Sequence, residues 1–466
     1  MAISFKISCP LALILICASL LGSDIFHTLN PAWANDKANE DWLSIRLTNQ
    51  TRIEALENQF RSALDQNDEL LTVKTGIEVE ARLSDVIRLG LEFVDVRGFR
   101  ADTLGAISSN FVDPAELFQA YIGLHFEDAF QTGANLDIIA GRQGIDIGSR
   151  RLIGRNGFRT SPNLFTGVSA IWDSGKDDTL TLVYLLPQIR RPNSPQELVD
   201  NVIQFNNSDL DLQVWGIHYA RNFRHNVLAE AFIFGLHDRD DFGERNSNNR
   251  QIYTPGGRLF KKPATGLIDY EFEGGIQFGS RVATTSPLDT EELSVFAQYF
   301  HGEVGYSFDT LFSPRLTLEL DYASGDSDVN DDSFNRFDPL FGPIAGDFGP
   351  TNIYTLIARS NLITPSTQLL LKTSKRSDVL FAYRSAFLAS ATDSFGNSGV
   401  IDINGNSGRF AGHQINARLR YTLIAEKVRF EFGGAIFLNG DFFDNAPNAN
   451  DFGNPTYGYM QVNLGF

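Results

Sequence analysis

The sequence predicts an all-β protein: a transmembrane antiparallel β-barrel of about 18 strands, with short periplasmic turns and long extracellular loops. Three observations carry this prediction. Apolar and polar residues alternate with a period of two along many segments, the connections between these segments are alternately short and long, and the chain ends in an amphipathic segment closing on Phe466. The 38 Phe and 13 Tyr among 466 residues suit a wall that faces lipid.

The composition excludes several other classes of protein. A formal net charge of −18 argues against a protein that binds duplex nucleic acid, which needs a basic surface. An aromatic content of 12% argues against a disordered chain. No run of 18 or more uncharged apolar residues follows the N-terminal segment, so a helical membrane protein is not expected.

Residues 1–34 have the pattern of a secretory signal peptide. Lys6 precedes an apolar stretch, and an Ala-Trp-Ala tripeptide that ends at Ala34 fits a cleavage site. Cleavage removes both cysteines, so the mature part, 35–466, is expected to form one outer-membrane barrel domain without disulfides. The alternative is an N-terminal anchor that stays uncleaved.

Eighteen segments show the period-two pattern. From Val73 to Leu83, for example, apolar residues alternate with Lys, Gly, Glu and Arg. Each segment with its connection takes about 24 residues, which suits a membrane-crossing strand and a turn. In chain order the segments lie near 43–54, 70–83, 87–97, 116–127, 134–143, 165–173, 179–187, 210–221, 227–237, 249–260, 266–279, 291–308, 315–323, 353–373, 378–388, 413–424, 428–437 and 456–466.

The lengths of the connections indicate the two sides of a membrane. Connections after even-numbered segments are mostly short and those after odd-numbered segments mostly long, which is typical of an outer-membrane barrel. Segment 353–373 contains Thr364-Pro365-Ser366, which fits a turn, but one bulged strand preserves the alternation. The long connections are 55–69, 98–115, 144–164, 188–209, 324–352, 389–412 and 438–455.

The last segment indicates the compartment. Met460, Val462, Leu464 and Phe466 occupy one face of the segment. A terminal aromatic residue on a lipid-facing row resembles the signal that barrel-assembly machinery recognises. We therefore expect this machinery to be a partner of the protein through Phe466. The expected location is the outer membrane of a Gram-negative-type bacterium, in contact with lipid and lipopolysaccharide. The alternative is a chance terminal strand of a periplasmic protein.

Several motifs resemble the alginate-export family of outer-membrane porins. The clearest run is Ala140 to Gln143, then Ser149 to Arg155, then Phe165 to Val168. The chain departs from the family pattern where Thr166 replaces an acid and where Ile-Gly-Ser replaces Tyr-Gly-Asp before the arginines. The motifs keep the family's order from about residue 40 to the C-terminus. Further matches are Thr254 to Arg258, Tyr322 to Asp326, Phe337 to Phe341 and Gly440 to Phe442.

The resemblance implies a channel. It implies an 18-stranded barrel whose arginine-lined pore passes an anionic polysaccharide, an alginate-like polyuronate, by passive diffusion. A periplasmic export partner would supply the polymer. We expect a monomer without a cofactor.

Alternation places cations on the inward face of the predicted barrel. Arginine suits a path for polyanions because its planar fork binds a carboxylate at two points and stays charged. A narrow lumen with low-dielectric walls strengthens the attraction. By alternation the predicted inward set on strands is Arg46, Arg52, Lys74, Arg82, Arg88, Arg384, Arg418, Arg420 and Arg429, and the family motif that begins at Thr254 adds Arg258 to the predicted path.

Arg142 and one loop complete the predicted substrate path. Strict alternation points Arg142 to lipid, but a bulge near Gly141 or Gly144 would turn it inward, and the family match favours that. Four arginines in one long connection predict a loop that folds into the barrel as a positive constriction: Arg150, Arg151, Arg155 and Arg159.

Other readings of these residues stay open. Carboxylates share the inward face, so the arginines also fit a solvated ion-pair lattice, and the loop arginines fit a solvent-exposed loop. A general or small-solute anion-selective porin, or a structural or adhesive surface barrel, would use the same fold. We expect neither an enzyme nor a metal site, because the usual catalytic motifs are missing and Asp331 stands where a calcium loop needs glycine.

Overall fold

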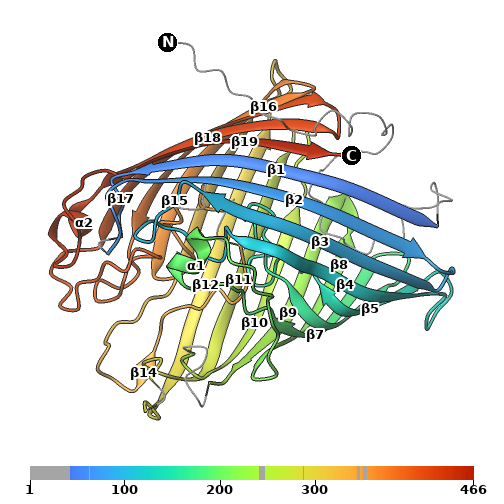
Figure 1. The fold of residues 1–466 in the computed structure, drawn as a ribbon, viewed down its shortest axis with the longest axis horizontal. Helices are drawn as coiled ribbons and strands as arrows, with labels where there is room; N and C mark the ends of the chain where they lie inside the picture. The colour runs from blue at the N-terminus through green and yellow to red at the C-terminus, as the bar shows by residue number, and fades with distance from the viewer. Residues whose placement is uncertain (1–41, 62, 241–246, 287, 344–346, 350–353) are drawn as a thin grey trace.

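The structure is a closed antiparallel barrel in which every wall strand pairs with the strand before and after it, and β19 pairs with β1 (Figure 1). The computed structural model describes residues 42–61, 63–240, 247–286, 288–343, 347–349 and 354–466. The predicted signal peptide, residues 1–34, lies outside this part. The wall strands are β1 (Leu43–Glu57), β2 (Asp68–Arg82), β3 (Ile87–Phe99), β4 (Asp113–Glu127), β5 (Asn135–Gln143), β6 (Phe165–Asp173), β7 (Asp178–Pro187), β8 (Leu212–Phe223), β9 (Val227–Asp238), β10 (Arg250–Lys261), β11 (Ile268–Val282), β12 (Glu292–Ser307), β13 (Arg315–Ala323), β15 (Leu362–Ser374), β16 (Ser377–Phe387), β17 (Phe410–Ile424), β18 (Val428–Asn439) and β19 (Thr456–Gly465).

A few short elements lie outside the wall. β14 (Ser333–Phe334) belongs to a long loop and pairs in parallel with β12. The described residues also contain a 3₁₀ turn (Arg224–Asn226) and two five-residue helices, α1 (Pro195–Val199) and α2 (Asp441–Asn445). No helix in this part of the chain has the length and apolar character needed to cross a membrane.

The wall follows the alternation of the sequence. On β11, Phe272, Ile276 and Phe278 are exposed on the outer face, whereas Glu273 and Gln277 are buried on the inner face. A one-residue slip of register would place carboxylates in lipid, so the membrane fixes the register of each strand. Each of the eighteen predicted segments corresponds to one wall strand.

The two ends of the barrel differ as predicted. Short turns such as 83–86, 174–177 and 425–427 lie at one end, which is the periplasmic end in this class of barrel. The long loops and α2 lie at the other end, opposite the C-terminus (Figure 1). The prediction of short periplasmic turns and long extracellular loops is therefore confirmed.

One predicted strand was too long. β15 begins at Leu362, whereas 353–373 was expected to be a single bulged strand. Tyr354 and residues 356–361 are buried in succession without alternation, because they pack inside the barrel as part of a loop. Pro365 lies within β15 opposite Leu320 and makes no turn.

Two long loops fold into the barrel. We call them the first inward loop (144–164) and the second inward loop, which is the described part of 324–361. Ile153 of the first and Phe341 of the second form a parallel β-bridge, and the Phe165 ring packs edge-on against Phe341 at 5.8 Å. These loops, with their neighbours, form a buried apolar cluster inside the barrel, at the extracellular end. The loops thus supply the hydrophobic core and narrow the lumen.

Candidate functional site

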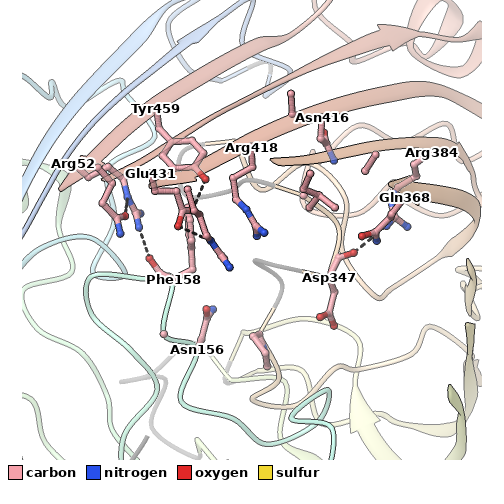
Figure 2. Close-up of a pocket in the computed structure, with 18 of the residues that line it drawn as sticks. Arg52, Asn156, Phe158, Asp347, Gln368, Arg384, Asn416, Arg418, Glu431 and Tyr459 are labelled. Atoms are coloured by element: carbon pink, nitrogen blue, oxygen red, sulfur yellow. Dashed lines mark hydrogen bonds and ion pairs between the residues drawn. The ribbon is translucent and has the colours of Figure 1, made fainter. Parts of the chain in front are cut away.

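A cavity of about 350 Å³ lies in the lumen between the two inward loops and the wall from β15 round to β1. This volume is at the lower end of the range for small-ligand sites, roughly 300–1,000 Å³. Figure 2 shows wall side chains facing residues of the loops across this space. Its described lining carries six arginines and two acids: Arg52, Arg150, Arg384, Arg418, Arg420, Arg429, Asp347 and Glu431.

Arg52 joins the wall to the first inward loop. Its side chain is fully buried, with Nε donating to Gln461 Oε1 at 2.6 Å and Nη2 donating to the carbonyl oxygen of Phe158 at 2.9 Å. The guanidinium also lies 3.9 Å from the centre of the Phe158 ring, a cation–π contact. Glu54 balances the charge at 3.2 Å. Arg52 therefore anchors Phe158 at the edge of the cavity.

Arg418 and Arg420 are accessible arginines of the cavity wall. Arg420 Nε lies 3.0 Å from Glu431 Oε2, and the Tyr459 hydroxyl donates to the other oxygen of Glu431 at 2.7 Å (Figure 2). Arg418 pairs with Asp378 at 3.3 Å. Their side chains stay 35% exposed for Arg420 and 23% for Arg418. A soluble anion can therefore reach guanidinium groups that are already oriented by carboxylates.

Arg384 holds the second inward loop. It is buried and donates to the carbonyl oxygen of Asp347 at 2.9 Å. Glu319 at 3.3 Å and Asp321 at 3.7 Å neutralise its charge from the wall. Arg384 is accordingly a link between β16 and the loop.

The first inward loop crosses the lumen. Arg155 Nη2 lies 2.7 Å from Glu92 on β3, and Arg151 Nη1 lies 2.9 Å from Glu273 on β11, eight strands further round the wall. Burial alone would lower the pKa of Arg155, but Glu92 more than offsets this and raises it. The loop enters the barrel as expected, and carboxylates of the wall neutralise the charges of these two arginines.

The remaining inward cations lie outside the cavity. Arg46 is 45% exposed and pairs with Glu78 at 3.4 Å. Arg258 lies between Glu230 at 3.2 Å and a carboxylate of β11. The other two strand residues of the predicted path are placed by their neighbours: Lys74 lies 5.1 Å from the Phe118 ring, and Arg82 faces Arg88 across β2 and β3.

Arg142 joins β5 to its neighbours at the extracellular end. The register runs unbroken through Gly141 and pairs Arg142 with Ala120 and Thr166, on the row that carries Ile122 to the outer surface. The guanidinium bonds Glu116 and the carbonyl oxygen of Asn206 at 3.0 Å. Arg142 therefore links the wall to a loop, and no register shift marks the bulge that was expected near it.

Sequence reasoning missed the acids and aromatics that the loops bring to the cavity. Asp347 and Phe158 reach it only because both loops fold inward. Arg359, in the second inward loop, pairs with Asp347 at 2.7 Å and is buried. The run of apolar residues around 354–358, which breaks the alternation, is the sequence signal for an inward loop.

Comparisons with known proteins agree with this architecture. A family model described as "Alginate export" matches residues 41–452. OccK8 (OprE) of Pseudomonas aeruginosa superposes with a TM-score of 0.58 at 12% identity, over 91% of this chain and 98% of that one. OccAB2 of Acinetobacter baumannii gives 0.57 at 11% identity, over 91% and 98%.

A third similar structure holds a ligand. OccK2 (OpdF) of Pseudomonas aeruginosa, solved in complex with glucuronate, gives a TM-score of 0.55 at 10% identity, over 91% of this chain and 98% of that one. At these identities the likeness concerns the fold. No curated protein matches the chain.

Proposed function

The chain belongs to the alginate export family and is an outer-membrane channel rather than an enzyme, and we propose that it passes an anionic, alginate-like polyuronate by passive diffusion through the cationic cavity. The excess of arginines over acids in the described cavity lining is the observation that carries this proposal. Forked guanidinium groups bind carboxylates, and low-dielectric walls strengthen the attraction. The glucuronate held by OccK2 is a uronate of the same chemical class.

Planar-bilayer recordings test this proposal. We expect a channel that prefers anions and whose current is blocked by polyuronate at lower uronate concentration than by free glucuronate, because several carboxylates of one chain meet several arginines. A cation-selective current that polyuronate leaves unchanged would overturn the proposal. A barrel with no conductance would favour a structural or adhesive role.

A small-anion channel is the second candidate. The bridge between Ile153 and Phe341 ties two loops together across the lumen, which favours solutes the size of one or two sugar units. A deletion strain separates the two candidates. Loss of polymer export with unchanged uptake of small anions supports the first, and the reverse supports the second.

The proposed partners follow from the same function. Delivery of polymer from a periplasmic partner fits a passive channel, and Phe466 is proposed as the signal for barrel assembly. Phe466 and Leu47 exchange two backbone hydrogen bonds of 2.9 Å beside the seam between β1 and β19, which supports a role in closure. Truncation of Phe466 is expected to reduce the amount of folded barrel in the membrane.

A further inference from the structure

Arg159 and Arg190 share an unusual partner. Arg159 Nη1 donates to Oδ1 of Asn110 at 2.9 Å, and Arg190 Nη1 donates to the same oxygen at 3.0 Å. Two cations thus converge on one neutral amide oxygen. Other arginines of the wall and inward loops lie within 4 Å of a carboxylate: Arg52, Arg142, Arg151, Arg155, Arg258, Arg384, Arg418 and Arg420.

The charge of this pair is not balanced nearby. Among the described residues, no carboxylate lies within 4 Å of either guanidinium. Asp113, which acts on Arg190 from further away, already accepts from Ser161 Oγ at 2.7 Å and from Asn206 Nδ2 at 3.0 Å. Burial and the neighbouring Arg190 lower the pKa of Arg159 to about 9. The two cations therefore repel each other at neutral pH.

The pair lies in the long loops beside the cavity. Arg159 directly follows Phe158, which lines the cavity. Arg190 comes from the loop after β7 and Asn110 from the loop after β3, both at the extracellular end. Both arginines are only partly buried. A solute at this end can therefore reach the pair.

We propose that Arg159 and Arg190 form an oxyanion-binding site at the extracellular mouth, which takes one carboxylate or phosphate group between the two guanidiniums. Two planar forks match the oxygens of such a group. The bound anion would replace the Asn110 oxygen and remove the repulsion between the cations. The site goes beyond the proposed function, because it does not depend on which polymer the cavity accepts.

Binding measurements on the whole channel in detergent test the site. The Arg418→Gln/Arg420→Gln background removes two accessible cations of the cavity wall. Binding at the mouth can then be measured whether or not the cavity carries the proposed function. In that background, Arg190→Gln is expected to weaken the binding of glucuronate or inorganic phosphate by about tenfold. Arg191→Gln removes the same charge from the neighbouring position and is expected to leave binding unchanged.

A second variant guards against a merely structural effect of Arg190. Asn110→Asp places a carboxylate between the two guanidiniums and is expected to raise the unfolding temperature and abolish the response to both anions. In the channel that keeps both Arg190 and Asn110, the affinities for the two anions are compared. A higher affinity for glucuronate than for phosphate assigns the site to a saccharide carboxylate, and the opposite order assigns it to a phosphate group. Equal binding in Arg190→Gln and Arg191→Gln, or an unchanged response in Asn110→Asp, would overturn the proposal.

Discussion

Arg155 of the first inward loop and Glu92 of β3 form an ion pair inside the barrel, with Arg155 Nη2 at 2.8 and 2.7 Å from the two carboxylate oxygens. The pair ties the loop to the wall, and removing one partner of such a largely buried pair costs roughly 3–5 kcal/mol. Arg155→Met is therefore expected to loosen the loop and give a larger, noisier single-channel current in planar bilayers.

An exposed ion pair provides the control for this prediction. Arg100 and Glu69 lie at the extracellular end, and both side chains are more than half exposed. Exposed pairs contribute about 0–1 kcal/mol, so Glu69→Gln should leave the current unchanged. If the Arg155→Met channel has the wild-type current and noise, the ion pair does not fix the first inward loop to the wall.

Charge selectivity is expected to depend on Arg418 and Arg420. Replacing both with Gln removes two accessible cations of the cavity wall and should lower the anion-to-cation permeability ratio roughly threefold at 0.1 M salt, and less at 1 M because of screening. The measurement is the reversal potential in a salt gradient. Arg221→Gln, which removes an exposed charge near the periplasmic turn, is the matched control. Equal shifts in both variants would exclude selection in the cavity.

Gly157 offers a way to narrow the cavity without disturbing its wall. A Cβ built at this glycine meets no atom within 4 Å, so a side chain there extends into open space. Gly157→Phe is expected to reduce the conductance about twofold or more while the unfolding temperature stays the same. Gly157→Ala, which adds only a methyl group, should conduct normally. A normal conductance in Gly157→Phe would place the conducting path elsewhere.

Arg159 makes the stability of the loops depend on pH. Its pKa is lowered to about 9 in the folded chain, because burial and the neighbouring Arg190 disfavour the charged form. Below pH 9 the folded protein therefore holds a charge that its surroundings disfavour. The cost falls as the pH rises above about 9, since over that range the folded chain loses the proton that the unfolded chain still keeps. The urea midpoint of the wild type should rise relative to that of Arg159→Gln over this range, and a constant difference would contradict the lowered pKa.

The wall was predictable from the sequence because water and lipid act on alternate residues. On β11 each carboxylate between Asp269 and Glu273 has to face inward, so register and orientation follow from the pattern alone. Pro365 was correctly expected to lie within a strand. It pairs with Leu320 of β13, and neither Thr364 nor Pro365 is paired with β16, so a proline is accepted at this position.

The interior was less predictable because loops carry no periodic constraint. Nothing local in the sequence joins Arg155 to Glu92, which lie 63 residues apart, or Ile153 to Phe341. The contacts of Arg142 are equally remote in sequence: it bonds Glu116 of β4 and the carbonyl oxygen of Asn206 in the loop after β7. The partners of charged residues depend on which loops fold inward, and this is decided by packing between distant segments.

The β-bridge between Ile153 and Phe341 restricts how this channel can be re-engineered. Surface loops of a barrel are usually exchangeable one at a time, because each contacts little besides solvent. Here a transplanted first inward loop would leave Phe341 and its neighbours without the surface they pack against. Chimeras with related channels should therefore fold when both inward loops are exchanged together. The two loops act as one structural unit.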